Sequence, residues 1–559
     1  MKKIYILFIV PFILYTAMLG IVPQMDPDET RYSLIASEMN ESGNYVTPHL
    51  KHTVYLEKPP LVAWVTAVAF KVFGETDFSA RLFAGLSAWG CIVLAFFMGR
   101  HFRDEKTGLF ASAVLTISLF PFILGRINIL DMPLAFFVCL AIWLGYLYLE
   151  EGRRRYLYLA YLSAALAFLI KGMIGAVLPA AVLFLWICST RQWRNITKLI
   201  SPPGIVIFLA VVFPWLYLVQ KENKDFLWYF FVHEHFLRFA TKTHGKTEPF
   251  YFFIPIILAG TLPWSVFLIR AWQPRTMKQW LFKKEENKLL AVWVLFIFFF
   301  YTVSSSKLAP YIAPVFVPLA VWAGSIFRMY EQDLSDPSGR RMIFYRIAVT
   351  LQSLLLMLAL LAMPLIKKYL DSSSDLVIMT SDCWWIYILP PLCGAILLMF
   401  LPDLVARKTG RNWFLTLYMS SCLLLAGMIL PFKDFISPYR STLVARDAIA
   451  RYVPKDALLY QYRDILYGVD YYNKIRTAAA GDFGELGFGI IQLPPEERRK
   501  YFLYRDEFFA RLENEKEVYC IIKRRERLSE LQEKYPDVEI LWDNGAFFLL
   551  KFKQSTKDK

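Results

Sequence analysis

Residues 1–31 read MKKIYILFIVPFILYTAMLGIVPQMDPDETR, two lysines followed by a long apolar run and then by a group of carboxylates. The basic start is typical of a signal peptide, but the apolar run is longer than that of a signal and no small-residue cleavage site ends it. A helix crosses a bilayer with about 20 mostly apolar residues. We therefore predict that residues 4–23 form an uncleaved membrane span.

The composition extends this prediction to most of the chain. Of the 559 residues, 57% are hydrophobic and only 19% are charged, whereas soluble domains average about 45–50% apolar and about 25% charged residues. Disordered proteins, disulfide-rich secreted modules and ordinary cytosolic enzymes are thereby excluded. The apolar runs predict an all-α polytopic membrane protein with about 13 transmembrane helices. They cover residues 4–23, 81–99, 107–125, 131–149, 156–171, 173–189, 204–219, 250–270, 289–303, 310–327, 346–365, 383–401 and 413–431.

The distribution of charge predicts the orientation. The formal net charge is +15, and with a cytoplasmic N-terminus the loops on that side hold 24 Lys and Arg against 10 Asp and Glu. An excess of Lys and Arg in cytoplasmic loops is the usual orientation signal. We therefore expect the N-terminus in the cytoplasm and the C-terminal region outside. Nucleic acid is not expected as a partner, because the charge is spread over short loops instead of one basic patch.

This topology divides the chain into two domains. Residues 1–431 form the transmembrane domain, and its outer loops at 24–80 and 220–249 are candidates for chemistry. Residues 432–559 alternate strand-like and helical patterns, which predicts a small α/β domain on the outer side. No catalytic motif is visible there, so we expect this domain to be structural or to contact an acceptor. The Lys171-Gly172 pair lies at a further outer turn or inside one long kinked helix.

The first outer loop carries the densest group of candidate residues. Asp28 and Glu29 follow the first span directly, and the pattern of residues 30–41 predicts an amphipathic helix on the membrane surface. The Pro59-Pro60 pair favours extended backbone at Glu57 and Lys58. The carboxylates are candidates for catalysis. Ion pairing with Arg31 and Lys58, or capping of the surface helix, is the alternative.

Other outer positions add groups of complementary chemistry. Asp131 begins the fourth predicted span, where it could take part in catalysis or cap the helix. Lys307 and Tyr311 lie at the outer end of the ninth and tenth predicted spans, and the segment HEHFLR, residues 233–238, adds histidines and Arg238. Cations beside a tyrosine suit a ligand that carries a phosphate. In a membrane protein, this ligand is expected to be a lipid phosphate.

The motifs of the outer loops also carry a family resemblance. Asp-Glu-x-Arg-Tyr after the first span, Glu-Lys-Pro-Pro before the second, Leu-Asp-x-Pro, Glu-His-x-x-Arg-Phe and Ser-x-x-Lys-Leu-x-x-Tyr resemble the polyprenyl-phosphate-sugar glycosyltransferases of the GT-C fold. The resemblance spans the whole chain. Within that family it is closest to the bacterial transferases that move 4-amino-4-deoxy-L-arabinose from undecaprenyl phosphate to lipid A, a modification associated with polymyxin resistance.

The resemblance implies a bacterial inner-membrane glycosyltransferase with a periplasmic C-terminal domain. It implies that the essential carboxylate is Asp28. The resemblance and the chemistry of the outer face together imply six residues that would hold the lipid phosphate. They are Arg31, Tyr55, Lys58, Lys307, Tyr311 and Arg238. Glu29 and Asp131 are the further catalytic candidates. Glu57 and His235 match a pair that can hold a divalent cation such as zinc or magnesium, although the additional His233 leaves the liganding histidine open.

A mechanism follows as a hypothesis. The leaving group is a phosphate anion, so cations and a tyrosine hydroxyl would stabilise it as its charge develops. If the acceptor is a hydroxyl, Asp28 is a general base. If the acceptor is a lipid A phosphate, Asp28 orients the donor or stabilises positive charge on the sugar. The alternatives are the same donor with another acceptor, such as a core sugar or a protein Ser/Thr, or transport of a lipid-linked sugar.

Overall fold

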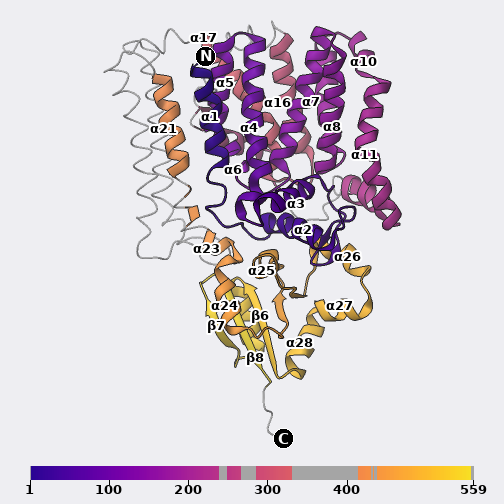
Figure 1. The fold of residues 1–559 in the computed structure, drawn as a ribbon, viewed down its shortest axis with the longest axis vertical. Coiled ribbons are helices and arrows are strands. Elements are labelled where there is room, and N and C mark those ends of the chain that lie inside the picture. Colours follow the sequence, from indigo (N-terminus) through magenta and orange to yellow (C-terminus); the bar gives the residue numbers. More distant parts are fainter. Residues whose placement is uncertain are drawn as a thin grey trace.

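The computed structural model consists of a helical bundle and a smaller unit that contains a sheet. It describes residues 2–237, 248–262, 264–265, 285–329, 413–427, 429, 432–433 and 437–554. The N-terminus lies at one end of the bundle, and the sheet-containing part lies beyond the other end (Figure 1). We call residues 437–554 the C-terminal unit and the end of the bundle that faces it the outer end.

Most helices of the bundle follow the predicted apolar runs. They are α1 (Lys2–Thr16), α4 (Asp77–Phe102), α5 (Glu105–Ile117), α6 (Leu119–Leu124), α7 (Asp131–Glu151), α8 (Arg154–Lys171), α9 (Ile174–Ser189), α10 (Arg194–Leu199), α11 (Pro202–Glu222), η1 (Trp228–Leu237), α13 (Phe253–Gly260), α16 (Glu285–Val303), η2 (Ala309–Val315), α17 (Phe316–Met329) and α21 (Trp413–Gly427). Five described segments are long and apolar enough to cross a membrane, 77–102, 131–151, 202–222, 285–303 and 309–329. The protein is therefore a multi-pass membrane protein.

Some predicted spans differ in detail. The run at 107–125 is two helices, α5 and α6, because the backbone is extended at Ser118 between them. α8 and α9 are also separate, since Gly172 between them has φ of +74°, a conformation that glycine adopts without strain. The predicted spans at 346–365 and 383–401 lie outside the described residues, as do parts of 250–270 and 413–431. The total of about 13 spans stays a prediction.

The first outer loop folds over the outer end of the bundle. It contains helix α2 (Asp28–Ser42), a hairpin of β1 (His49–Leu50) and β2 (Thr53–Val54), and helix α3 (Leu61–Phe73). The helix predicted at 30–41 is confirmed, and it is covered by protein on more than one side. Ten of the fifteen residues of α2 are buried, because α3 packs on one side and the C-terminal unit on the other.

The C-terminal unit is built on a six-stranded mixed sheet of order β5-β4-β3-β6-β8-β7. Strands β5, β4, β3 and β6 run parallel, and β8 pairs antiparallel with β6 and β7. Its elements are α23 (Ser437–Arg440), η4 (Thr442–Ala445), α24 (Arg446–Tyr452), β3 (Leu459–Tyr462), α25 (Tyr467–Asn473), β4 (Ala478–Ala480), η5 (Gly484–Leu486), α26 (Gly487–Ile491), α27 (Pro495–Tyr501), β5 (Phe502–Leu503), α28 (Arg505–Asn514), β6 (Glu517–Lys523), α29 (Arg525–Lys534), β7 (Glu539–Asp543) and β8 (Phe547–Lys553).

Both faces of the sheet are covered. Successive residues of a strand point to opposite faces, and Cys520 and Ile521 of β6 accordingly belong to different hydrophobic clusters. Helices pack on each side, so the central strand is buried almost throughout.

The C-terminal unit docks closely onto the first outer loop. Asp26 accepts hydrogen bonds from the amide of Gly468 at 2.7 Å and the hydroxyl of Thr442 at 2.8 Å. A Cβ atom at Gly489 of α26 would lie 2.2 Å from the carbonyl oxygen of Val54. Only a glycine permits this contact between the two backbones, so the unit and the loop pack as one body at the outer end.

Candidate active site

The two adjacent carboxylates of the first outer loop have different environments. The Asp28 side chain is 72% exposed and lies 3.5 Å from the Arg31 guanidinium, whereas the Glu29 side chain is only 1% exposed. Successive helix residues are turned by about 100°, so the first turn of α2 directs one carboxylate outward and the other inward. Asp28 is therefore accessible to a substrate.

The carboxylate of Glu29 is fully used in hydrogen bonds to other residues of the protein. Its two oxygens lie 2.7 Å from the Nε and Nη2 atoms of Arg81 and also accept from the amides of Asn128 and Met25. Arg81 in turn donates to the carbonyls of Leu19 and Pro23. This network ties α2 to the ends of α1 and α4. The structure thus corrects the predicted catalytic role of Glu29 to a structural one, because no oxygen of it is available to a substrate.

Arg31 lies between two carboxylates and two aromatic rings. Its Nε is 2.7 Å from an oxygen of Glu485, and its guanidinium carbon lies 5.9 and 5.8 Å from the rings of Tyr32 and Tyr467. The hydroxyl of Tyr467 donates to Glu485 at 2.7 Å. Glu485 and Tyr467 come from the C-terminal unit, so both domains build the surroundings of this arginine.

Tyr55, Glu57 and Lys58 follow the hairpin. The ammonium of Lys58 lies 3.7 Å from the carboxylate of Glu57 and donates to its carbonyl at 3.0 Å. Tyr55 is 2% exposed, and its hydroxyl has no hydrogen-bond partner among the described residues. Burial raises its pKa, and the nearby charges that act on it are those of Glu485, Glu57 and Arg31. A buried hydroxyl without a partner is costly, which indicates that it serves a ligand.

A second group lies where α7, α8 and η2 meet. Asp131 begins α7, but its side chain does not cap the helix; it accepts a hydrogen bond from the ammonium of Lys171 at 2.6 Å. That ammonium lies 4.2 Å from the centre of the Tyr311 ring. The ammonium of Lys307 donates to the carbonyl of Glu248 at 2.9 Å.

Tyr32 connects the two groups. Burial raises the pKa of its hydroxyl, and the charges that act on it include Arg31, Glu485, Asp131 and Asp28. The carboxylates of α2, α7 and the C-terminal unit therefore share one region at the outer end of the bundle.

Two predicted residues cannot be placed in this region. Arg238 is outside the described residues, and of His235 only the helical backbone of η1 is described. Among the described residues, no three His, Cys, Asp or Glu side chains are placed to hold a metal. Glu57 is paired with a lysine instead, and the metal-binding pair of Glu57 and His235 stays a prediction.

Three residues of this region are not among the predicted site residues. The sequence predicts Lys171 only as part of an outer turn, and Glu485 and Tyr467 lie in a domain without a visible motif. A cation at the end of an apolar helix could have drawn attention to Lys171. No local pattern points to the other two, because their role depends on docking.

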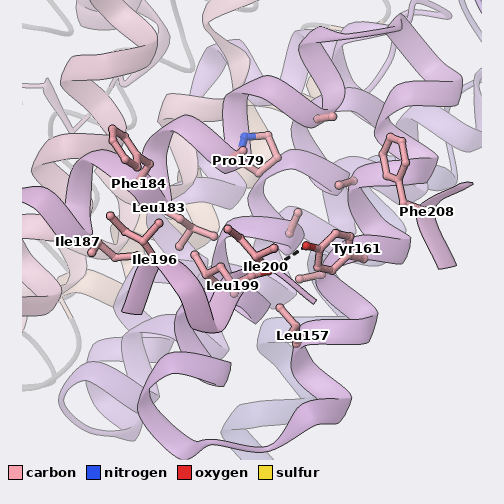
Figure 2. A pocket seen from close by; sticks show the side chains of 16 residues that line it. Leu157, Tyr161, Pro179, Leu183, Phe184, Ile187, Ile196, Leu199, Ile200 and Phe208 are labelled. Carbon is pink, nitrogen blue, oxygen red and sulfur yellow. Dashed lines mark hydrogen bonds between the residues drawn. The ribbon is translucent and has the colours of Figure 1, made fainter. Parts of the chain in front are cut away.

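A separate cavity of about 490 Å³ lies among α7, α8, α9, α10 and α11. Its lining is apolar apart from Tyr161, whose hydroxyl donates to the carbonyl of Leu199 at 2.9 Å (Figure 2). Because α10 lies at the end opposite the C-terminal unit (Figure 1), this cavity is not part of the charged site.

Comparison with known proteins places this geometry in context. Residues 57–218 match the family model of dolichyl-phosphate-mannose-protein mannosyltransferases. Over its whole length the structure resembles ArnT from Cupriavidus metallidurans bound to undecaprenyl phosphate, with a TM-score of 0.81, 22% identity and coverage of 99% of this chain and 98% of that one. An archaeal oligosaccharyltransferase from Archaeoglobus fulgidus gives a TM-score of 0.52 at 13% identity. The fold is that of the GT-C glycosyltransferases.

Sequence relatives specify the family. The undecaprenyl phosphate-α-4-amino-4-deoxy-L-arabinose arabinosyl transferase of Pseudomonas paraeruginosa is 30% identical over 413 residues, which cover 69% of this chain and 73% of that protein. A second such transferase, from Pseudomonas fluorescens, is 32% identical, and there the chain spans about half of the relative's length, 54%. The chain belongs to the family of undecaprenyl phosphate-aminoarabinose arabinosyl transferases.

Proposed function

We propose that this protein transfers 4-amino-4-deoxy-L-arabinose from undecaprenyl phosphate to a phosphate of lipid A at the outer face of the bacterial inner membrane. The observation that carries the proposal is the joint presence of Arg31, an accessible Asp28 and the unpartnered hydroxyl of Tyr55 at the outer end of an apolar bundle, among the residues that the structure describes. Family membership supplies the donor and acceptor classes.

The cations serve the donor phosphate in this proposal. The phosphate oxygens would receive positive charge and directed hydrogen bonds from Arg31, Lys58 and the hydroxyl of Tyr55. These interactions strengthen as the phosphate leaves with its full charge, which lowers the barrier. No general acid is then needed.

Asp28 serves the sugar in the same proposal. A lipid A phosphate is already ionised at neutral pH, so the acceptor requires no strong base. The exposed Asp28 carboxylate is free to orient the donor and to stabilise positive charge that develops on the sugar ring. The Asp131–Lys171 pair would contribute to the same region.

The proposed orientation has a cytoplasmic N-terminus and a periplasmic C-terminal unit. These two parts lie at opposite ends of the bundle (Figure 1), and the basic loops predicted to face the cytoplasm favour this direction. Reporter fusions at the two ends would test it, and a cytoplasmic C-terminal unit would contradict it.

The decisive experiment is mass spectrometry of lipid A. Cells that express the protein in a strain without endogenous transferase should gain aminoarabinose on lipid A, and cells with Asp28→Asn should not. The match to protein mannosyltransferases favours a protein Ser/Thr as the second candidate acceptor. Glycosylated periplasmic protein with unmodified lipid A would support that candidate instead.

A further inference from the structure

The C-terminal unit contributes a carboxylate to the proposed phosphate site. Glu485 lies in η5 and contacts Arg31 of α2 at 2.7 Å, and both side chains are only 18% exposed. The hydroxyl of Tyr467, from α25, holds the same carboxylate oxygen at 2.7 Å.

Charged side chains of both signs meet in this region. The cations include Arg31, Lys58 and Lys171, and the carboxylates include Asp28, Glu57, Asp131 and Glu485. A donor phosphate that binds Arg31 adds a negative charge beside Glu485 and competes with it for the guanidinium. A second anion beside a largely buried carboxylate is unfavourable.

A donor with a positive charge beside its phosphate removes this difficulty. The amino group of 4-amino-4-deoxy-L-arabinose is an ammonium ion at neutral pH, so the donor sugar-phosphate is a zwitterion. Its ammonium can pair with Glu485 while its phosphate pairs with Arg31. Such a ligand adds no net charge, whereas a neutral sugar on the same lipid phosphate would add a negative charge beside Glu485.

The Tyr55 hydroxyl is the second observation that points to a ligand here. It is buried, it has no partner among the described residues, and the charges that act on it include Glu485 and Arg31. A hydrogen-bonding group that the described part of the protein does not use therefore lies near the Arg31–Glu485 pair.

We propose that Glu485 is the specificity-determining residue that recognises the amino group of the donor sugar, and that Tyr467 positions it. The inference rests on the proposed function and deepens it by assigning donor selection to the C-terminal unit. The ammonium of the sugar pairs with Glu485, while the phosphate of the same donor pairs with the neighbouring Arg31.

The test compares two donors on purified protein in lipid vesicles with lipid A as acceptor. One is undecaprenyl phosphate-linked 4-amino-4-deoxy-L-arabinose, and the other is the same molecule with a hydroxyl in place of the amino group. Wild type should prefer the amino donor. Glu485→Gln should lower kcat/KM for the amino donor roughly tenfold to a hundredfold, as expected for a charge-assisted hydrogen bond, and leave that for the hydroxyl donor unchanged or higher.

Glu530→Gln is a matched control. Glu530 lies in the same unit, is 22% exposed, accepts from the hydroxyl of Tyr462 at 2.9 Å and pairs with Arg463 at 3.0 Å. The control should keep the wild-type preference. If Glu485→Gln lowered kcat/KM equally for both donors, the proposal would be overturned, because Glu485 would then have a structural role.

Two further outcomes are distinguishable. If wild type transfers neither sugar to lipid A, the proposed function itself fails. If Glu485→Gln does not accumulate, Tyr467→Phe replaces it, since this change removes only the hydroxyl that holds Glu485. That variant should reduce the preference for the amino donor, and an unchanged preference would refute the assignment.

Discussion

The ammonium of Lys51, in the turn of the first outer hairpin, lies 2.8 Å from the carboxylate of Asp470 in the C-terminal unit, and both side chains are buried. The same ammonium donates to the hydroxyl of Thr477 at 2.6 Å, and Gln461 donates to Asp470 at 3.0 Å. The polar groups are thus satisfied inside the contact, as buried charges require. This cluster joins the loop that carries Asp28 to the unit that carries Glu485.

Breaking this pair should weaken the protein strongly. Lys51→Met leaves the Asp470 carboxylate buried without its cation, which typically costs about 3–5 kcal/mol. A large drop in the thermal midpoint of the purified protein should follow. Lys553→Met is the control, because Lys553 is exposed and its pair with Glu539 is a surface pair, worth at most about 1 kcal/mol. Equal midpoints for the two variants would disprove the role of the cluster.

The adjacent carboxylates of α2 should respond in opposite ways. Asp28→Asn should abolish transfer with little change in the thermal midpoint, because Asp28 is mostly exposed. Glu29→Gln should lower the midpoint instead, since it leaves the guanidinium of Arg81 buried beside a neutral group. Transfer in vesicles and thermal unfolding measure the two effects. Wild-type transfer by Asp28→Asn would remove Asp28 from the mechanism.

Tyr55→Phe separates binding from folding. The hydroxyl has no partner among the described residues, so its removal should leave the thermal midpoint unchanged or slightly higher. If it binds the donor phosphate, KM for the donor should rise by roughly tenfold, the value of about one hydrogen bond to a charged group. Unchanged transfer at limiting donor would exclude this contact.

Lys58→Ala should also weaken use of the donor. The change removes a cation that is largely shielded from solvent, so KM should rise at both low and high ionic strength, because salt screens a shielded charge only weakly. Kinetics at limiting donor and two salt concentrations measure it. An unchanged KM at both salt concentrations would contradict the proposed contact of Lys58 with the donor.

Glu38 should make stability depend on pH. Burial raises the pKa of this carboxyl from 4.5 to about 8, with Lys51, Asp470, Glu41 and the His52 amide around it. Between these pH values the folded protein holds a proton that the unfolded chain has lost, so stability falls as pH rises through this window. The slope is at most about 1.4 kcal/mol per pH unit.

Glu38→Gln isolates this effect. The variant should match wild type near pH 5 and become relatively more stable toward pH 8, measured as the difference between the two thermal midpoints. Burial lowers the pKa of His49 and His52, which gives the opposite trend with pH in both proteins and cancels in the difference. A constant difference would contradict the raised pKa of Glu38.

Much of the fold could be predicted from local patterns. The apolar runs coincide with α4, α7, α8 and α9 to within a few residues. The burial of α2 between α3 and the C-terminal unit was not predicted. Its sequence pattern shows where polar residues lie on the helix, but it does not show that a distant domain covers them.

The candidate site could be predicted only in part. Asp28, Arg31, Tyr55 and Asp131 do lie at one end of the bundle, as the pattern of the outer loops suggested. Adjacent carboxylates look alike in a sequence, and only the rotation of the helix separates the accessible Asp28 from the saturated Glu29.

By itself the sequence determined that this protein crosses a membrane more than once, because the cost of placing a side chain in lipid adds up residue by residue along a helix. The tertiary structure alone decided which charges meet. Glu485 reaches Arg31, and Asp470 reaches Lys51, only after the C-terminal unit docks on the first outer loop. The strength of such pairs depends on distance in space and on burial, and neither quantity is local in the sequence.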